Sequence, residues 1–295
     1  MALSPDSIAA AFLAACRAEL DALKPGNVHR FAGGHGMDVD VFDRSAEVSA
    51  PGIAAPGASV GLRILRAVEA TRSAVGMNTN LGILLLAAPL AAAAEQVETT
   101  RPADSARVRL HAAVADVLAR LTAEDAANAF RAIAHASPGG LGTDEAHDVR
   151  EPPSIGLVDA MLLAAPRDLV ARQYTENFTA VFDVGLPALR AARAAGESGM
   201  WPTIRCFLAF AAAFPDSHVG RKFGSATAES LRSEMQALRV DLGTLTDPGD
   251  QESALLAFDT RLKAAGLNPG TSADLTVASL FAEELVRRLE DCRPG

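Results

Sequence analysis

Cysteine and aromatic residues are both scarce in this chain of 295 residues. Its three cysteines, Cys16, Cys206 and Cys292, are odd in number and far apart, which argues against a disulfide framework and a CxxC metal site. Aromatic residues make up 5% of the sequence, whereas 49% is hydrophobic. A core built mainly from Ala and Leu suits closely packed helices better than strands. We therefore expect a helical protein from a reducing compartment.

An excess of positive charge and a long apolar run are also missing. The formal net charge is −9, so nucleic acid is not expected as a partner, because binding its backbone needs a basic surface. The most apolar run, residues 81–94, is shorter than the roughly 18–20 residues of a membrane span and contains Pro89. The first 23 residues read as an amphipathic helix, not as a signal peptide. We predict a cytoplasmic protein without membrane association.

Helical punctuation and spacing recur along the chain. Ser4 precedes Pro5 as an N-cap precedes a first turn, and Thr122 with Asp125 resembles a capping box. Expected helices span residues 4–23, 39–50, 58–75, 79–96, 104–121, 123–136, 155–165, 167–181, 186–195, 201–213, 226–241, 251–265 and 272–290. We predict one all-α domain over residues 1–295, a multi-helix bundle with the apolar helix at its centre. The long apolar helices are compatible with a homodimer.

Several common catalytic motifs are absent. The sequence has no GxxxxGK[ST] loop, HExxH pair or paired CxxC, which removes support for several enzyme classes. Polar residues gather instead in the segments between helices, at 24–38, 75–82, 136–154, 215–225 and 267–274. Long loops in compact domains are often functional, although some are only linkers.

The first of these segments, KPGNVHRFAGGHGMD, combines cations, glycines, an imidazole and a carboxylate. Glycine allows close approach of a ligand to the backbone, and consecutive N–H groups can form an anion-binding concavity. Lys24 and Arg30 could hold phosphate together with these amides, while His35 and Asp38 add titratable groups. A solvated turn between two helices remains the alternative for this segment alone.

The other segments carry similar mixtures. Asn78, Thr79 and Asn80 precede the apolar helix and exceed what a single N-cap requires, which favours an anionic or polar ligand at this positive helix end. The run DSHVGRK suits metal and phosphate binding, or is a charged surface turn. In NPGTSADL, Ser272 and Asp274 belong to a site or only cap the next helix.

Together these segments resemble the triphosphoribosyl-dephospho-CoA synthase family. KPGNVHR, GGHGMD and VFDRSA resemble the opening of that family, and an Asn-Thr element with Gly82 follows in the same order. FPDSHV and FDTRLKAAGLNPGTSADL resemble two later elements. The resemblance runs from about residue 16 to residue 282, and the KPG opening and the last element are its most specific parts.

The resemblance implies an all-α enzyme of prosthetic-group biosynthesis that uses ATP as a substrate. In this family a hydroxyl of 3′-dephospho-CoA attacks the anomeric carbon of the ATP ribose, adenine leaves, and the triphosphate stays attached. Such chemistry needs neutralisation of the triphosphate, for which Mg²⁺ is expected, a general base for the hydroxyl and a proton donor for adenine.

The matching motif positions place the site on a small set of residues. The implied nucleotide-binding residues are Lys24, Gly26, Asn27, Asn78, Thr79, Asn80, Arg221 and Ser272. The implied catalytic residues are His35, Asp38 and Asp216, and the implied metal ligands are Asp38, Asp216 and Asp274.

Departures from the family pattern indicate a divergent branch. The usual Asn-Thr-His-Lys-Gly is Asn-Thr-Asn-Leu-Gly here, so Asn80 and Leu81 replace a histidine and a lysine. Leu65 stands where a glutamate is usual. One alternative is a related ribosyl transferase in the biosynthesis of tetrahydromethanopterin-type one-carbon carriers. Others are a non-catalytic nucleotide-binding homologue and a different nucleotide-dependent enzyme, such as a nucleotidase.

Overall fold

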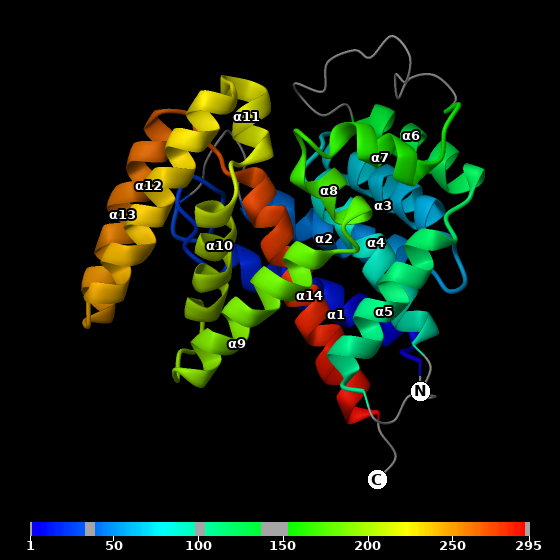
Figure 1. The fold of residues 1–295 in the computed structure, drawn as a ribbon, viewed down its shortest axis with the longest axis horizontal. Coiled ribbons are helices and arrows are strands. Elements are labelled where there is room, and N and C mark those ends of the chain that lie inside the picture. The colour runs from blue at the N-terminus through cyan, green and yellow to red at the C-terminus, as the bar shows by residue number, and fades with distance from the viewer. Residues whose placement is uncertain (1, 33–38, 98–103, 137–152, 293–295) are drawn as a thin grey trace.

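The protein is all-α over the part of the chain that the computed structural model describes, residues 2–32, 39–97, 104–136 and 153–292. This part forms fourteen α-helices and a π-helical turn, and it contains no strand (Figure 1). The helices are α1 (Pro5–Leu20), α2 (Val39–Ile53), α3 (Val60–Val75), α4 (Leu81–Gln96), α5 (Ala106–Ala119), α6 (Ala123–Ala136), α7 (Leu157–Ala164), α8 (Leu169–Thr175), α9 (Leu186–Ala194), α10 (Trp201–Ala213), α11 (Ser217–Phe223), α12 (Ser225–Thr244), α13 (Pro248–Ala264) and α14 (Gly270–Asp291), with η1 (Val181–Gly185) between α8 and α9. The predicted fold class is confirmed.

The structure contains the N-caps that were predicted for two helices. Ser4 Oγ accepts a hydrogen bond from the N–H of Ser7, with Pro5 in the first turn of α1. Thr122 and Asp125 form the expected capping box, since each accepts a hydrogen bond from the other's backbone N–H. Local sequence therefore determines where these helices begin.

Two expectations about the elements were wrong. Residues 217–223, expected in a loop, form the short helix α11, which Asp216 caps. The single helix expected over residues 167–181 ends at Thr175, because Asn177 and Phe178 take left-handed backbone conformations, with φ of 50° and 60°. The chain then resumes through η1 into α9.

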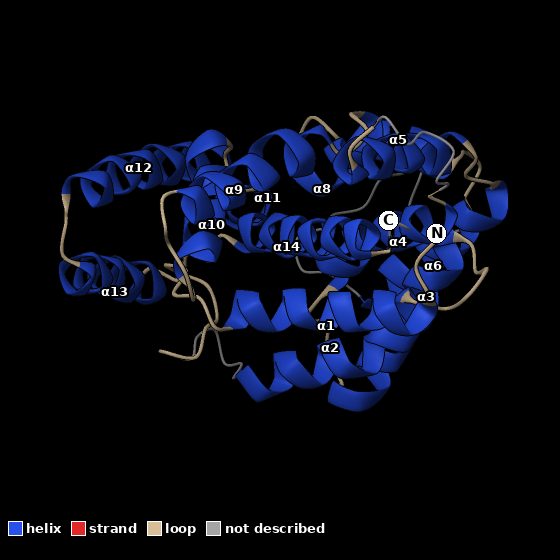
Figure 2. Cartoon of the chain, turned by 90° about the horizontal axis from the view of Figure 1, so that it is seen from below, coloured by secondary structure: helices blue, strands red, loops and turns tan. Residues whose placement is uncertain are grey.

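Helix α4 is the buried central helix predicted from composition. Every residue from 84 to 94 is buried, and α4 packs against α1, α2, α3, α5, α8 and α14. Figure 2 shows α4 and α14 in the middle, with α1 and α2 on one side and α5, α8 and α9 on the other. No helix in the described ranges is long and apolar enough to cross a membrane.

The core consists of two hydrophobic clusters. The larger surrounds α4 and α14, and the smaller lies between α10, α11, α12 and α13. Helix α10 joins them, because Cys206 and Phe210 belong to the larger cluster while Phe207 and Leu208 belong to the smaller. Figure 1 shows the α12–α13 pair at one end of the molecule. The single domain over residues 1–295 stays a prediction.

Candidate functional site

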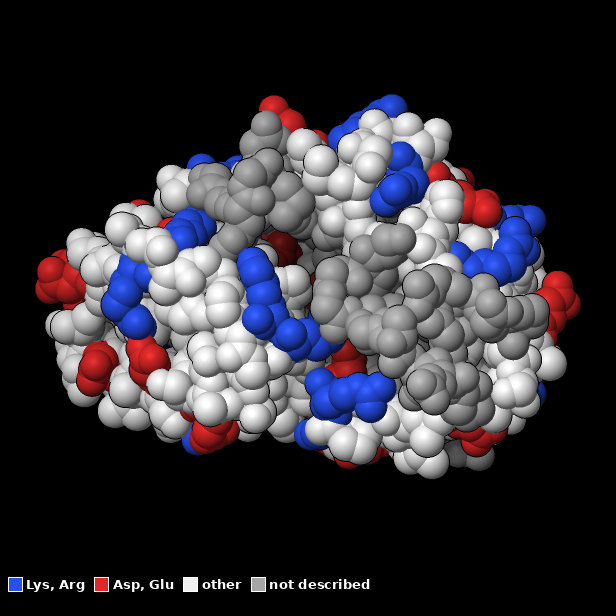
Figure 3. Space-filling model, turned by 90° about the horizontal axis from the view of Figure 1, so that it is seen from above, with Lys and Arg blue, Asp and Glu red and all other residues white. Residues whose placement is uncertain are grey.

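A cavity of about 620 Å³ lies where the N-terminal ends of α4 and α14 meet the segment after α1, the helices α6 to α8, and α11. Viewed from above, the face between the α11 side and the α6–α7 side is hollowed, with acidic side chains at depth and Lys and Arg side chains around them (Figure 3). A concave site of this size, with polar groups at one end, is typical of small-molecule binding.

The start of α4 brings two of the three predicted polar residues to the cavity wall. Asn78 Oδ1 accepts a hydrogen bond from the N–H of Leu81 at 3.1 Å, and Thr79 Oγ1 donates to Ser45 at 2.7 Å. Asn80 is instead buried against α2, where its Nδ2 lies 3.4 Å from Ser49 Oγ. It does not line this cavity. Asn80 borders a neighbouring cavity of about 10 Å³.

Asp274 packs directly against this helix end. It comes from the first turn of α14, and a Cβ added at Gly82 would lie 2.0 Å from its Oδ2. Only glycine at position 82 leaves room for this carboxylate. Asp274 has no hydrogen-bond partner among the described residues, and its pKa is well above the ordinary value because of burial and of the negative charges of Asp216 and Glu19.

Asp216 organises the site from behind the wall. Its Oδ1 accepts from the N–H groups of His218 and Val219, and its Oδ2 accepts from the N–H and the hydroxyl of Ser272, both at 2.8 Å. Four donors satisfy the lone pairs of this buried carboxylate. Burial raises the pKa of Asp216, partly offset by the hydrogen bonds from Ser272. Neither Asp216 nor Ser272 lines the cavity, so the structure does not bring them to a bound ligand.

Lys24 also faces inward rather than toward the cavity. Its side chain is fully buried, and its Nζ donates to the carbonyls of Glu19 at 2.7 Å and Val28 at 2.9 Å. It also pairs with the Glu19 carboxylate at 3.0 Å. Burial lowers the pKa of Lys24, and Glu19 opposes that shift. Lys24 therefore shapes the turn that presents Glu19 and Val28 to the cavity.

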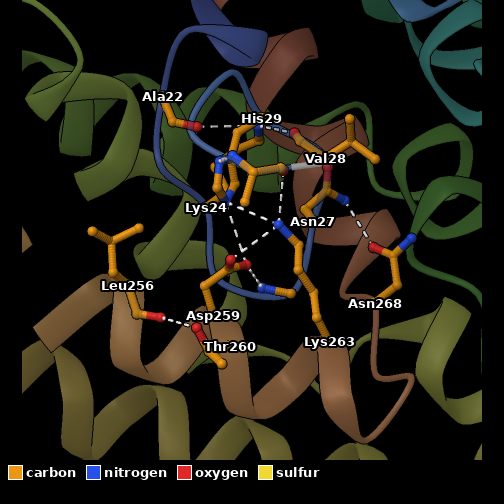
Figure 4. A network of polar contacts seen from close by, with 12 residues as sticks. Ala22, Lys24, Asn27, Val28, His29, Leu256, Asp259, Thr260, Lys263 and Asn268 are labelled. Atoms are coloured by element: carbon orange, nitrogen blue, oxygen red, sulfur yellow. Dashed lines mark hydrogen bonds and ion pairs between the residues drawn. The ribbon is translucent and has the colours of Figure 1, made fainter. Parts of the chain in front are cut away.

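Helix α13 anchors the same turn through Asp259 (Figure 4). Its Oδ1 accepts from the N–H of Gly26 at 2.8 Å, and its Oδ2 pairs with Lys263 at 3.0 Å. The N–H of Ala32 donates to Nδ1 of His29, so Nε2 of His29 carries the proton and lies 3.3 Å from Asp259. Burial lowers the pKa of His29, which keeps the ring neutral.

Gly26 and Asn27 place this turn against the start of α14. Gly26 has φ of 81°, and a Cβ there would lie 2.8 Å from the carbonyl oxygen of Leu267. Asn27 Nδ2 donates to Asn268 Oδ1 at 2.9 Å, and both asparagines line the cavity. Gly26, expected among the nucleotide-binding residues, does not line the cavity and allows close approach of the turn to the backbone of Leu267, while Asn27 does line the cavity.

Three arginines line the cavity. Arg221 pairs with Asp168, which caps α8 and also lines the cavity. Among the described residues, Arg72 has no side-chain partner, and Arg167 donates to the carbonyl of Leu163 alone. Sequence reasoning identified only Arg221. No local signal marked Arg72 and Arg167, which stand at the end of α3 and in the short α7–α8 connection.

Two predicted residues, the catalytic His35 and the catalytic and metal-binding Asp38, lie outside the described residues. Within the described ranges, no group of three or more His, Cys, Asp or Glu side chains could hold a metal ion. Asp216 is saturated by protein donors, whereas Asp274 lines the cavity and accepts no hydrogen bond from the part of the chain that the structure describes. A hard ion that takes one carboxylate and substrate phosphates fits Asp274 better than Asp216.

The profile of the ATP:dephospho-CoA triphosphoribosyl transferase family matches residues 5–293. The chain belongs to this family. A stretch of 112 residues is 30% identical to a protein of Pseudomonas putida named as a probable 2-(5''-triphosphoribosyl)-3'-dephosphocoenzyme-A synthase, and it covers 38% of this chain and 39% of that protein. The family resemblance of the loops is thereby confirmed.

The fold of the family is seen in a crystal structure from Archaeoglobus fulgidus that is assigned as a triphosphoribosyl-dephospho-coA synthase. It superposes on this chain with a TM-score of 0.60 and 22% sequence identity, covering 81% of this chain and 95% of the other. At this level of identity the likeness shows a shared fold.

Proposed function

We propose that this protein transfers the triphosphoribosyl group of ATP to a hydroxyl of a dephospho-CoA-type acceptor, in coenzyme biosynthesis. The main support for this proposal is the cavity of about 620 Å³ at two helix N-termini, in a chain that matches the family over residues 5–293. Adenine leaves the anomeric carbon as the acceptor oxygen bonds to it, and the hydroxyl proton passes to a base.

The polar end of the cavity is the proposed site of the triphosphate. The N-termini of α4 and α14 reach it, and the first turns of these helices of 16 and 22 residues present partial positive charge. Asn78, Thr79 and Asn27 add polar side chains, and Arg221 adds a cation. The proposed roles of Lys24, Gly26, Asn80 and Ser272 are to position this end.

Asp274 is the proposed metal ligand. Its carboxylate lines the cavity and has no hydrogen-bond donor among the described residues, and Mg²⁺ usually binds one or two carboxylates together with substrate phosphates. Bound there, the ion would supply the charge neutralisation that the triphosphate requires. Asp216 would hold the first turn of α14, and so Asp274, in place. His35 and Asp38 remain the proposed acid–base residues.

A second acceptor is favoured by one observation. Leu81 lines the cavity where the family motif has a lysine, so the start of α4 lacks a cation in this chain. A ribitol-bearing precursor of a tetrahydromethanopterin-type carrier, whose ribosyl bond is of the same chemical kind, is therefore the second candidate acceptor.

Product analysis tests the proposal. Purified protein is incubated with ATP, Mg²⁺ and either acceptor, and adenine is measured by chromatography. We expect adenine release that depends on dephospho-CoA. Release with the pterin precursor alone would favour the second acceptor, and phosphate instead of adenine would indicate a nucleotidase. ATP binding with no product would indicate a non-catalytic homologue.

A further inference from the structure

The cavity has a second, apolar part beyond its polar end. Helices α6 and α7 form this part, which we name the α6–α7 arm. Its walls carry Phe130, Ile133, Leu157, Met161 and Leu163. Leu163 is 50% exposed although it lines the cavity, so the arm opens to solvent near α7. Such an apolar surface does not bind a triphosphate, because the charge of a triphosphate needs hydrogen-bond donors and cations.

Two arginines of the cavity wall lack a carboxylate partner among the described residues. Two carboxylates on the cavity wall are already neutralised, Glu19 by Lys24 and Asp168 by Arg221. Arg72, at the end of α3, and Arg167, after α7, line the same cavity and have no carboxylate partner among the described residues. In a chain of net charge −9, two unpaired arginines on a cavity wall indicate a ligand with anionic groups, which guanidinium binds well.

The carboxylate and the two arginines come from different helices. Asp274, which has no hydrogen-bond partner among the described residues, belongs to the first turn of α14, where a metal-bound triphosphate is proposed, whereas Arg72 ends α3, which packs against α6, and Arg167 follows α7. Lys and Arg side chains lie on both sides of the hollow in Figure 3. A phosphate held by arginine alone, next to an apolar surface, differs in chemistry from a triphosphate held with a metal ion.

We propose that the α6–α7 arm is the acceptor subsite, and that Arg72 and Arg167 bind the phosphate groups of an acceptor whose remaining part is apolar or aromatic. The inference rests on the proposed function and assigns its two substrates to the two parts of one cavity. Dephospho-CoA, a diphosphate that carries an extended pantetheine chain, has this chemistry.

Two variants with matched controls test the assignment. Leu163→Asp places a carboxylate in the arm, and Leu162→Asp is its control, since Leu162 is 59% exposed and does not line the cavity. Arg72→Gln removes a cation, and Arg66→Gln on the same helix is its control, because Arg66 is exposed and lies away from the cavity. All four positions are solvent-accessible, so folding should be preserved.

Binding of dephospho-CoA alone and of ATP with Mg²⁺ is measured by calorimetry for the wild type and the four variants. We expect Leu163→Asp and Arg72→Gln to weaken dephospho-CoA binding by about tenfold or more. Binding of ATP should change by less than about twofold, and the controls should match the wild type.

The assignment is overturned if both variants weaken ATP as much as dephospho-CoA, if neither changes dephospho-CoA binding, or if the wild type does not bind dephospho-CoA. These measurements need no turnover. A wild type that binds dephospho-CoA in the arm but releases no adenine would therefore refute the proposed function and leave the acceptor subsite standing.

Discussion

At the scale of single residues, the carboxylate of Asp274 depends on the absence of a side chain at Gly82. Gly82→Ala would put a methyl group 2.0 Å from Oδ2 and 2.6 Å from Cγ of Asp274. The carboxylate must move, and misplaced catalytic groups commonly cost about a hundredfold in rate. We expect kcat for adenine release to fall by about that factor.

Gly243→Ala is the matched control for this substitution. Gly243 lies in α12, and a Cβ there would have no heavy atom within 4 Å. Alanine should stabilise the helix by about 0.5–1 kcal/mol and leave kcat unchanged. If both glycine variants keep wild-type kcat, the space at Gly82 has no role in the site.

Lys24 distinguishes a buried structural cation from a ligand-binding one. Lys24→Met leaves the buried Glu19 carboxyl without its partner, which should lower the free energy of unfolding by about 3–5 kcal/mol in urea titrations. The exposed Lys222 provides the control, and Lys222→Met should change stability by less than about 0.5 kcal/mol. If the Lys24→Met protein keeps wild-type stability but loses ATP affinity, the result would contradict this structural role and support the direct phosphate contact expected from the sequence.

Sequence reasoning identified residues of the site better than it identified their orientations. Asn27, Asn78, Thr79, Arg221 and Asp274 do line the cavity. Lys24, Asp216 and Ser272 come from the same motifs but point inward. A sequence motif identifies the loop that forms the site. It does not show which polar side chain stabilises the loop conformation and which one faces the ligand.

At the scale of elements, α13 holds the turn after α1 through one carboxylate. Asp259→Asn removes the charge that faces Lys263 and His29, and it weakens the anchor of Gly26. We expect a loss of about 1–3 kcal/mol of stability at pH 7 and a higher KM for ATP, because Asn27 shifts with the turn. Glu252→Gln on the same helix, where Glu252 has no partner among the described residues, should change neither.

The cost of Asp259→Asn should depend on pH. Burial alone would raise the pKa of Asp259, but hydrogen bonds from His29, Lys263 and the Gly26 N–H outweigh it and hold the pKa below its ordinary value of 3.8. The carboxylate therefore stabilises the fold above that pH, and its contribution disappears as the pH falls through the lowered pKa. Urea titrations should show the wild type and the variant converging below pH 3.8. A constant difference down to acid pH would contradict this origin of the stability.

Helix boundaries were predicted correctly where the cap lies close in sequence. They were predicted wrongly where contacts with distant parts of the chain determine them. The Thr122–Asp125 capping box was predicted and is present. Helix α11 was missed because a seven-residue segment that contains Gly220 and precedes Gly224 shows little periodicity, and its cap, Asp216, is fixed by Ser272 of a helix distant in sequence. The break after Thr175 depends on two left-handed residues that carry no glycine signal.

At the scale of the whole molecule, composition predicted the fold class and the central helix α4, since an Ala- and Leu-rich core without alternation leaves few other solutions. The cavity could not be predicted. Residues 27, 72, 78, 167, 221 and 274 meet there from ends of helices far apart in sequence. The homodimer stays a prediction, and light scattering would show twice the chain mass of 30.6 kDa if it is correct.

The retention of the triphosphate in the product tests the central claim most directly. Purified protein is incubated with Mg²⁺, dephospho-CoA and ATP labelled with ³²P at the γ-phosphate, and the products are separated by chromatography. The account predicts one adenine released for each acceptor consumed, with the γ-label in the coenzyme product. Label released as phosphate, or ATP consumed without free adenine, would contradict it.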